Sequence, residues 1–132
     1  MRFLRLSDRP PSVRWATYLM VADAAVSLLA VLGEGVASQS LDLAIVFLVV
    51  LQLAHLALVF AIAIGRRWAA VAYVLWFLYT VVNLSLNRHV YLSHGPLLIV
   101  WVAGSVAVEA IAIVLLVTPT ARAWFASPSA AS

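Results

Sequence analysis

Three ionisable side chains interrupt the apolar runs of this 132-residue chain. Asp23, His55 and Glu109 each stand within a run built mainly of Ala, Val, Leu and Ile. Carboxyl and imidazole groups exchange protons, pair with cations and accept hydrogen bonds, so they could support proton relay or binding of a small ligand. A charge at the centre of a membrane costs roughly 2.5 to 3.5 kcal/mol, so such residues are expected to face one another rather than lipid.

Other polar residues accompany the ionisable ones at helical spacing. Gln52 precedes His55 by three residues, Ser105 precedes Glu109 by four, and Asn83 falls on a polar stripe of its own run. This spacing places side chains on one face of a helix. We therefore predict one polar interior, whose binding or proton-relay candidates are Asp23, Gln52, His55, Asn83, Ser105 and Glu109.

The same residues also have a purely structural interpretation. Buried polar groups in a membrane protein can pair simply to hold helices in register. The sequence leaves both interpretations open. It predicts no catalytic residue, because the G-x-S-x-G and H-E-x-x-H motifs and the glycine-rich phosphate loops are absent.

No metal site or cofactor is predicted either. One His and two carboxylates could form a facial triad, but no local spacing motif supports it. A haem bound through His55 would need a dimer to supply two axial ligands. The chain has no Cys, which excludes disulfides, thiol redox chemistry and Cys metal sites.

Four long apolar runs must position these residues. A membrane-spanning helix needs about 20 residues, and each run has about 19 to 24. With 66% hydrophobic and 10% charged residues, the composition does not fit a soluble domain. We predict an all-α polytopic membrane protein, with residues 1–132 forming a single domain, a bundle of four transmembrane helices. The helices are expected at 15–33, 41–64, 68–86 and 97–117.

The basic residues orient the expected bundle. All eight are Arg, and seven lie at the predicted inner edges, so the positive-inside rule places both termini in the cytoplasm of a bacterial inner membrane. This pattern indicates topology, and no nucleic-acid partner is expected. The first run is longer than a signal-peptide core and contains Asp23, so we expect an uncleaved helix. The small, polar tail at 126–132 is expected to be disordered.

Alanines recur on the helix faces opposite His55 and Glu109. Small residues let membrane helices approach closely, although Ala is common throughout this chain. Besides membrane lipid, we expect a second copy of the chain or a larger membrane complex as partner. The candidate packing positions are Ala54, Ala57 and Ala61 in the second run and Ala103, Ala107 and Ala110 in the fourth.

Two resemblances add to this interpretation. The segments 115–119 and 122–125, near the end of the chain, resemble those of small four-helix bacterial membrane proteins of unassigned function, which implies no activity. In size and helix number the chain is similar to small multidrug resistance transporters, which use a carboxylate in the first helix. Asp23 would be the matching position. It is Asp where that family has Glu, and His55 and Glu109 depart from the family's pattern.

The sequence thus favours a small inner-membrane protein with a buried polar cluster, acting in proton-linked transport or small-ligand binding. The alternative is a non-catalytic accessory subunit of a larger membrane complex, docked through its alanine faces. The substrate, the partner and the oligomeric state are not specified by the sequence.

Overall fold

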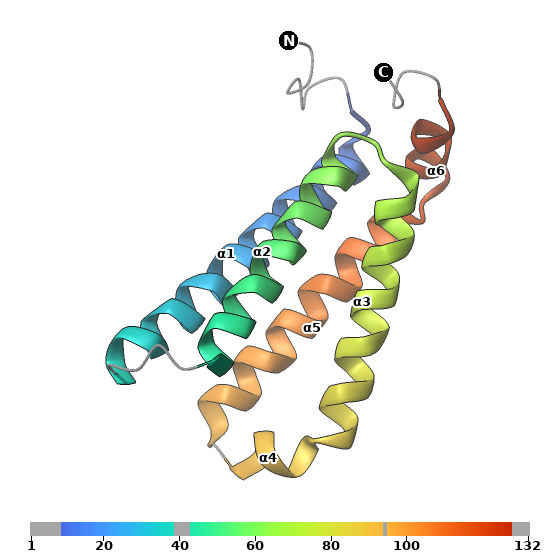
Figure 1. Cartoon of the computed structure of the whole chain (residues 1–132). Coiled ribbons are helices and arrows are strands. Elements are labelled where there is room, and N and C mark those ends of the chain that lie inside the picture. The colour runs from blue at the N-terminus through green and yellow to red at the C-terminus, as the bar shows by residue number, and fades with distance from the viewer. Residues whose placement is uncertain (1–8, 39–42, 94, 128–132) are drawn as a thin grey trace.

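The computed structural model describes residues 9–38, 43–93 and 95–127, and helices account for nearly all of them (Figure 1). Within these ranges, four helices are long and apolar enough to cross a membrane: α1, α2, α3 and α5. This confirms the all-α class and is consistent with a small membrane protein. The helix bounds are α1 Pro11–Ser38, α2 Leu43–Ala63, α3 Arg67–Leu86, α4 Arg88–Ser93, α5 Pro96–Leu116 and α6 Pro119–Ala126.

Local sequence signals account for the helix ends. A proline suits the first turn of a helix, because its missing N–H has no partner there, and α1, α5 and α6 all begin at one. Gly65 ends α2 with φ of 86°, a left-handed conformation that glycine adopts without strain. Its N–H donates to the Ile62 carbonyl at 2.9 Å, and the Arg66 N–H donates to the Ala61 carbonyl at 2.9 Å.

Two short helices were not predicted. The expected third connection contains α4, and the segment after α5 folds into α6. The Thr118 hydroxyl caps α6 by accepting from the Ala121 N–H at 3.4 Å. The tail expected to be disordered was predicted to begin at residue 126, but Ala126 is the last residue of α6. Residues 128–132 lie outside the described residues.

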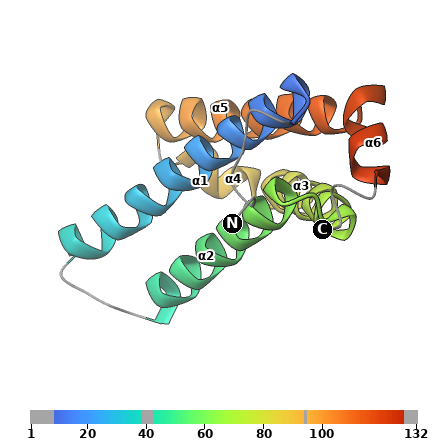
Figure 2. The same ribbon diagram turned by 90° about the horizontal axis from the view of Figure 1, so that it is seen from above.

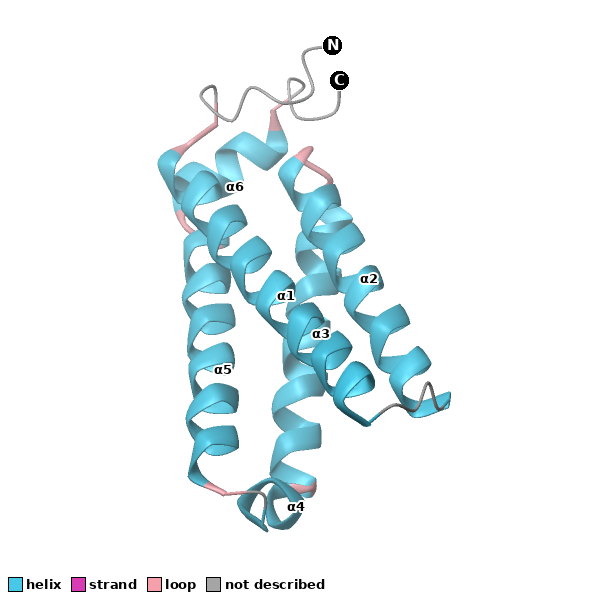
Figure 3. Cartoon of the chain, turned by 90° about the vertical axis from the view of Figure 1, so that its left-hand side faces the viewer, coloured by secondary structure: helices cyan, strands magenta, loops and turns pink. Residues whose placement is uncertain are grey.

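The four long helices pack side by side. α1 packs against α2 and α5, and α3 packs against the same two helices, so α2 and α5 occupy opposite corners of the arrangement. Figures 2 and 3 show the four helices from two further directions. The start of α1, the α2–α3 turn and α6 lie at one end of the molecule, and α4 lies at the other (Figure 1).

We call the half of the molecule that carries α6 the closed end. Its buried apolar side chains come from all four long helices and from α6. Several are alanines with no exposed surface, which lets the helix backbones come close together. The residues of this core are Val13, Ala16, Met20, Val59, Ala61, Ile62, Ala69, Tyr73, Ala112, Leu116, Ala121 and Phe125.

Helix α6 contacts the start of α1. The Ser12 and Thr120 hydroxyls lie 3.3 Å apart. The Arg9 guanidinium carbon lies 5.9 Å from the centroid of the Trp124 ring, within range of a cation–π contact. Partial burial lowers the pKa of Arg9 from its usual value, but a guanidinium stays charged in proteins. These contacts cover the closed end.

We call the half that carries α4 the open end. There α1 and α2 lean away from α3 and α5 (Figures 1 and 2). Among the described side chains beyond Ala24, His55, Tyr73 and Glu109 in this direction, Ile45 is the only buried one. The apolar core therefore occupies one half of the molecule, and exposed apolar side chains dominate the other.

Candidate functional site

The predicted ionisable residues lie where the packing of the closed end stops. His55 Nε2 lies 4.0 Å from Glu109 Oε1, and these side chains are only 3% and 6% exposed. Because α2 and α5 stand at opposite corners, this approach crosses the middle of the helix arrangement. The distance is longer than a hydrogen bond, and the two groups form an ion pair only when the imidazole is protonated.

Two aromatic rings of α3 hold the imidazole of His55. The Trp76 ring stacks on it, with centroids 5.4 Å apart and planes at 25°. The Tyr73 ring lies at 5.4 Å with its plane tilted by 39°. Tyr73 and Trp76 are three residues apart, so one face of α3 supplies both rings. These contacts restrict the imidazole's orientation relative to Glu109.

Asp23 joins the layer from α1. Its Oδ1 accepts a hydrogen bond from the Ser105 hydroxyl of α5 at 2.7 Å. Asp23 and Glu109 belong to α1 and α5, two helices that pack against each other. We refer to these side chains together as the polar layer: Asp23, Gln52, His55, Tyr73, Trp76, Ser105 and Glu109.

Several buried atoms of the polar layer have unused hydrogen-bonding capacity. Gln52 Oε1, His55 Nε2, Tyr73 Oη and Glu109 Oε2 are buried and have no partner among the described residues. Leaving a buried polar group unpaired costs about 1 to 3 kcal/mol. A group added to this layer that donates or accepts hydrogen bonds would therefore be stabilised there.

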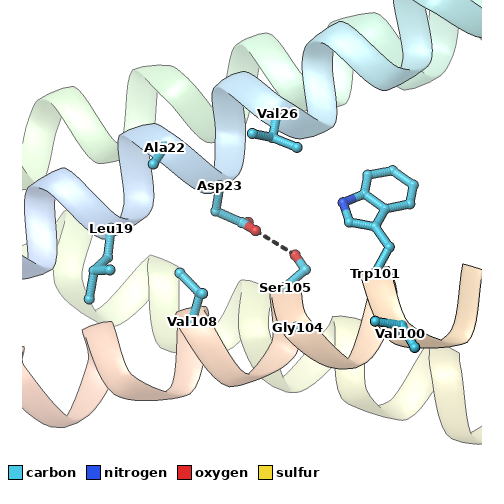
Figure 4. A pocket seen from close by; sticks show the side chains of 9 residues that line it. All are labelled: Leu19, Ala22, Asp23, Val26, Val100, Trp101, Gly104, Ser105 and Val108. Atoms are coloured by element: carbon cyan, nitrogen blue, oxygen red, sulfur yellow. Dashed lines mark hydrogen bonds between the residues drawn. The ribbon is translucent and has the colours of Figure 1, made fainter. Parts of the chain in front are cut away.

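A groove between α1 and α5 leads to the layer (Figure 4). Its volume is about 300 Å³, which falls at the small end of the usual range for ligand sites. The Asp23–Ser105 hydrogen bond crosses it, with the Trp101 ring on one side and Leu19 and Val108 on the other. The remaining lining residues are Ala22, Val26, Val100 and Gly104.

The groove is an apolar slot with one acidic wall. Such a site suits a molecule with an apolar body and a donor or cationic group, because the body contacts valines and leucine while the charge meets Asp23. The Trp101 ring could add a cation–π contact. Gly104 leaves space in the groove, since a Cβ built there meets no atom within 4 Å.

One predicted candidate does not reach the polar layer. Asn83 lies about 15 Å from Tyr73 along α3, at 1.5 Å per residue. Its Oδ1 accepts a hydrogen bond from the Asn87 side chain at 2.7 Å, and an orienting role for it stays a prediction. Contacts join Asp23 to Ser105 and His55 to Glu109, and Gln52 stands three residues before His55 with a buried Oε1. That they bind a ligand or relay protons stays a prediction.

The predicted alanine positions differ in how exposed they are. Ala54 and Ala57 on α2, and Ala103 and Ala107 on α5, are exposed. Ala110 is half-buried, and Ala61 belongs to the core of the closed end. Ala61 thus packs inside the chain, where α3 and α6 bring further core residues to its level. Partner binding through the exposed alanines stays a prediction.

Sequence reasoning missed Tyr73 as a member of the layer. The signal was available, because Tyr73, Trp76 and Thr80 follow one helical stripe that could have been traced one step earlier. Tyr79, three residues after Trp76, is by contrast 65% exposed. The groove residues Gly104 and Val108 carried no comparable signal, since their role depends on how far α1 stands from α5.

No family model matches the chain, and neither the curated proteins nor the solved structures gave a match. Within the part of the chain that the structure describes, no group of three or more His, Cys, Asp or Glu side chains could hold a metal ion. The function is therefore argued from the polar layer and the α1–α5 groove.

Proposed function

We propose that this membrane protein binds a small apolar cation in the α1–α5 groove and exchanges it for a proton, as a proton-linked transporter does. The observation that carries the proposal is the Asp23 carboxylate, which stands in the wall of an apolar groove and accepts a hydrogen bond from Ser105 across it. The fold alone would support many functions.

The exchange follows from the low polarity of the groove. A negative charge at this depth is costly unless a partner compensates it. Ser105 supplies one hydrogen bond to Asp23, which stabilises the carboxylate only in part. A proton or a bound cation would each remove the remaining cost. The two compete for the same oxygens, so binding of one releases the other.

Glu109 and His55 are the proposed path for the displaced proton. Two carboxyl groups that interact in a low-dielectric site do not readily carry charge together. The proton that a bound cation displaces from Asp23 would pass by way of Glu109, which faces His55, and then leave to the water. In this scheme the groove binds the ligand, and the His55–Glu109 pair takes part in the relay.

Direct binding measurements test the proposal. We expect benzyltrimethylammonium to bind the purified chain, and its neutral isostere neopentylbenzene to bind at least about tenfold less tightly, since losing a charge partner of this kind costs more than 1.4 kcal/mol. Calorimetry in weakly buffered detergent should show proton release on binding, and affinity that rises with pH. Equal affinity for the two probes would contradict the proposal.

A matched pair of variants locates the site. Asp23→Asn should abolish both the charge preference and the proton release. Glu34→Gln removes a carboxylate about 16 Å further along the same helix and should leave both unchanged. If the two variants behave alike, the groove is not the site.

We further propose that both termini face the cytoplasm of a bacterial inner membrane. The support is the clustering of Arg14, Arg66, Arg67 and Arg122 at the end where α1 starts and α6 lies, as the positive-inside rule requires. Reporter fusions at Arg67 should report an internal site, and fusions at Ser38 and Ser93 should report external sites. An external signal at Arg67 would reverse this topology.

An accessory role in a larger membrane complex is a second candidate. It is favoured by the exposure of Ala54 and Ala57 on α2 and of Ala103 and Ala107 on α5, because small residues at a helix surface allow close contact with another helix. Replacing Ala57 or Ala107 with Leu should then weaken association in lipid nanodiscs. A chain that stays monomeric in nanodiscs, with no partner co-purifying, would exclude this role.

A further inference from the structure

A second groove lies at the closed end, between α3, α5 and α6. Its volume is about 230 Å³. Leu116 and Phe125, both buried, form its floor, and Val71 and Val74 line its side along α3. This α3–α6 groove is separate from the polar layer and has no part in the proposed exchange.

Two guanidinium groups stand at this groove. Arg67 is the first residue of α3, and Arg122 belongs to α6. Both are exposed, and neither forms a salt bridge within the described part of the chain. None of the residues that line the groove is acidic. The groove is therefore positively charged, without a compensating carboxylate in its walls.

The charged and apolar parts of the groove are ordered along α3. Arg67 begins the stretch of α3 that is apolar enough to cross a membrane, so its guanidinium belongs at headgroup level. Val71 and Val74 follow on the same face, about 6 and 10 Å deeper at 1.5 Å per residue. A molecule lying along this face would meet two cations first and an apolar channel next.

We propose that the α3–α6 groove binds one anionic phospholipid. The phosphate would accept hydrogen bonds from Arg67 and Arg122, whose planar guanidinium groups suit phosphate oxygens. One acyl chain would run along Val71 and Val74. A free phosphate ion would use the two arginines but would gain nothing from the valines, so the apolar channel favours the lipid as the source of the phosphate.

The bound lipid joins two helices that are far apart in sequence. Arg67 belongs to α3 and Arg122 to α6, so one phosphate between them holds α6 against the span of α3. The lipid therefore stabilises the closed end, and the stability of this end depends on the charge of the surrounding leaflet.

Lipid titration of the purified, delipidated full-length chain tests this site. Native mass spectrometry should show phosphatidylglycerol binding about tenfold or more tightly than phosphatidylcholine with the same acyl chains, because each arginine near an anionic lipid contributes roughly a fivefold gain. Phosphatidylglycerol should also raise the melting temperature, whereas inorganic phosphate at the same concentration should not. Equal binding of the two lipids, or an equal effect of inorganic phosphate, would overturn the proposal.

Two double variants with the same change in net charge separate a built site from diffuse attraction. Arg67→Gln with Arg122→Gln should lose the preference for phosphatidylglycerol. Arg66→Gln with Arg88→Gln removes two exposed arginines that do not line the groove, and it should keep the preference. Circular dichroism confirms that both variants remain helical. If the second pair loses the preference as fully as the first, no specific site exists.

Discussion

The closed end and the open end hold their helices together in different ways. At the closed end, alanines without exposed surface bring the helices close, and Met20, Tyr73 and Ile62 fill the space between them. At the open end the corresponding stretches of helix carry large apolar side chains that face outward, such as Leu29 and Val100, 69% and 70% exposed. Both halves belong to the same four apolar spans.

The difference shows that apolar residues alone do not make the helices of a membrane protein pack closely. Lipid tails are as apolar as Leu, so helices gain little by burying Leu against one another. Close contact instead depends on small residues and on interlocking shapes, which the closed end has. The polar layer lies at the boundary, where packing shields His55 and Glu109 while the α1–α5 groove still reaches Asp23.

The largest expected effect comes from creating a cavity in the core of the closed end. Tyr73→Ala should lower the free energy of unfolding by about 2 to 4 kcal/mol, because a buried aromatic side chain leaves a cavity that the helices fill only in part. Unfolding in mixed micelles by a denaturing detergent measures it. Tyr79→Ala is the control on the same helix, where the side chain is 65% exposed. Similar losses in the two variants would remove the distinction between the two ends.

A smaller effect is expected in the polar layer. Ser105→Ala removes the donor of the 2.7 Å hydrogen bond to Asp23, and bonds to charged groups contribute about 1.5 to 3 kcal/mol. We expect a loss within or just below that range in the same assay. Ser85→Ala serves as control, since the Ser85 hydroxyl donates only to the Val81 carbonyl of its own helix. No loss in Ser105→Ala would mean that the α1–α5 hydrogen bond does not help to hold the two helices together.

The smallest expected effect concerns the α1–α5 groove. Gly104→Ala should leave the fold intact or stabilise it by about 0.5 to 1 kcal/mol, because Ala is the better helix former and a Cβ at this position meets nothing within 4 Å. Gly33→Ala, with equally open surroundings, should behave the same way.

A larger side chain at the same position separates the groove from the fold. Gly104→Leu adds bulk to the groove wall, so it should reduce benzyltrimethylammonium binding while leaving helix content unchanged. If Gly104→Leu lowers stability as much as Tyr73→Ala does, the groove belongs to the packed core and the contrast between the ends is wrong.

The sequence predicted the four long helices because an apolar run of sufficient length has few other structures available. It did not predict α6, although Pro119 follows the expected fourth helix and a proline begins helices well. Thr118 before it was the overlooked cap. Helical spacing therefore located spans better than it located their ends.

The candidate site was predicted only in part, for a geometric reason. Spacing along a helix tells which side chains share a face, and this grouped Asp23, His55 and Glu109. It does not tell which partner stands opposite. Asn83 was grouped with them by spacing alone, and the hydrogen bond from Asn87 is a contact that this spacing did not specify. The groove depends on the separation of α1 and α5, which no short stretch of sequence encodes.

The position of α6 also has a consequence for how the chain is made. Helix α6 packs against α1, the first described helix, through Ser12 and Thr120. Ribosomes add roughly 5 to 20 residues per second, so the helices from α1 to α5 are all synthesised before α6 exists. A chain that stops before Pro119 would hold every apolar span and still lack the helix that covers the closed end. Packing of α6 on the start of α1 therefore waits until all four described spans have been synthesised.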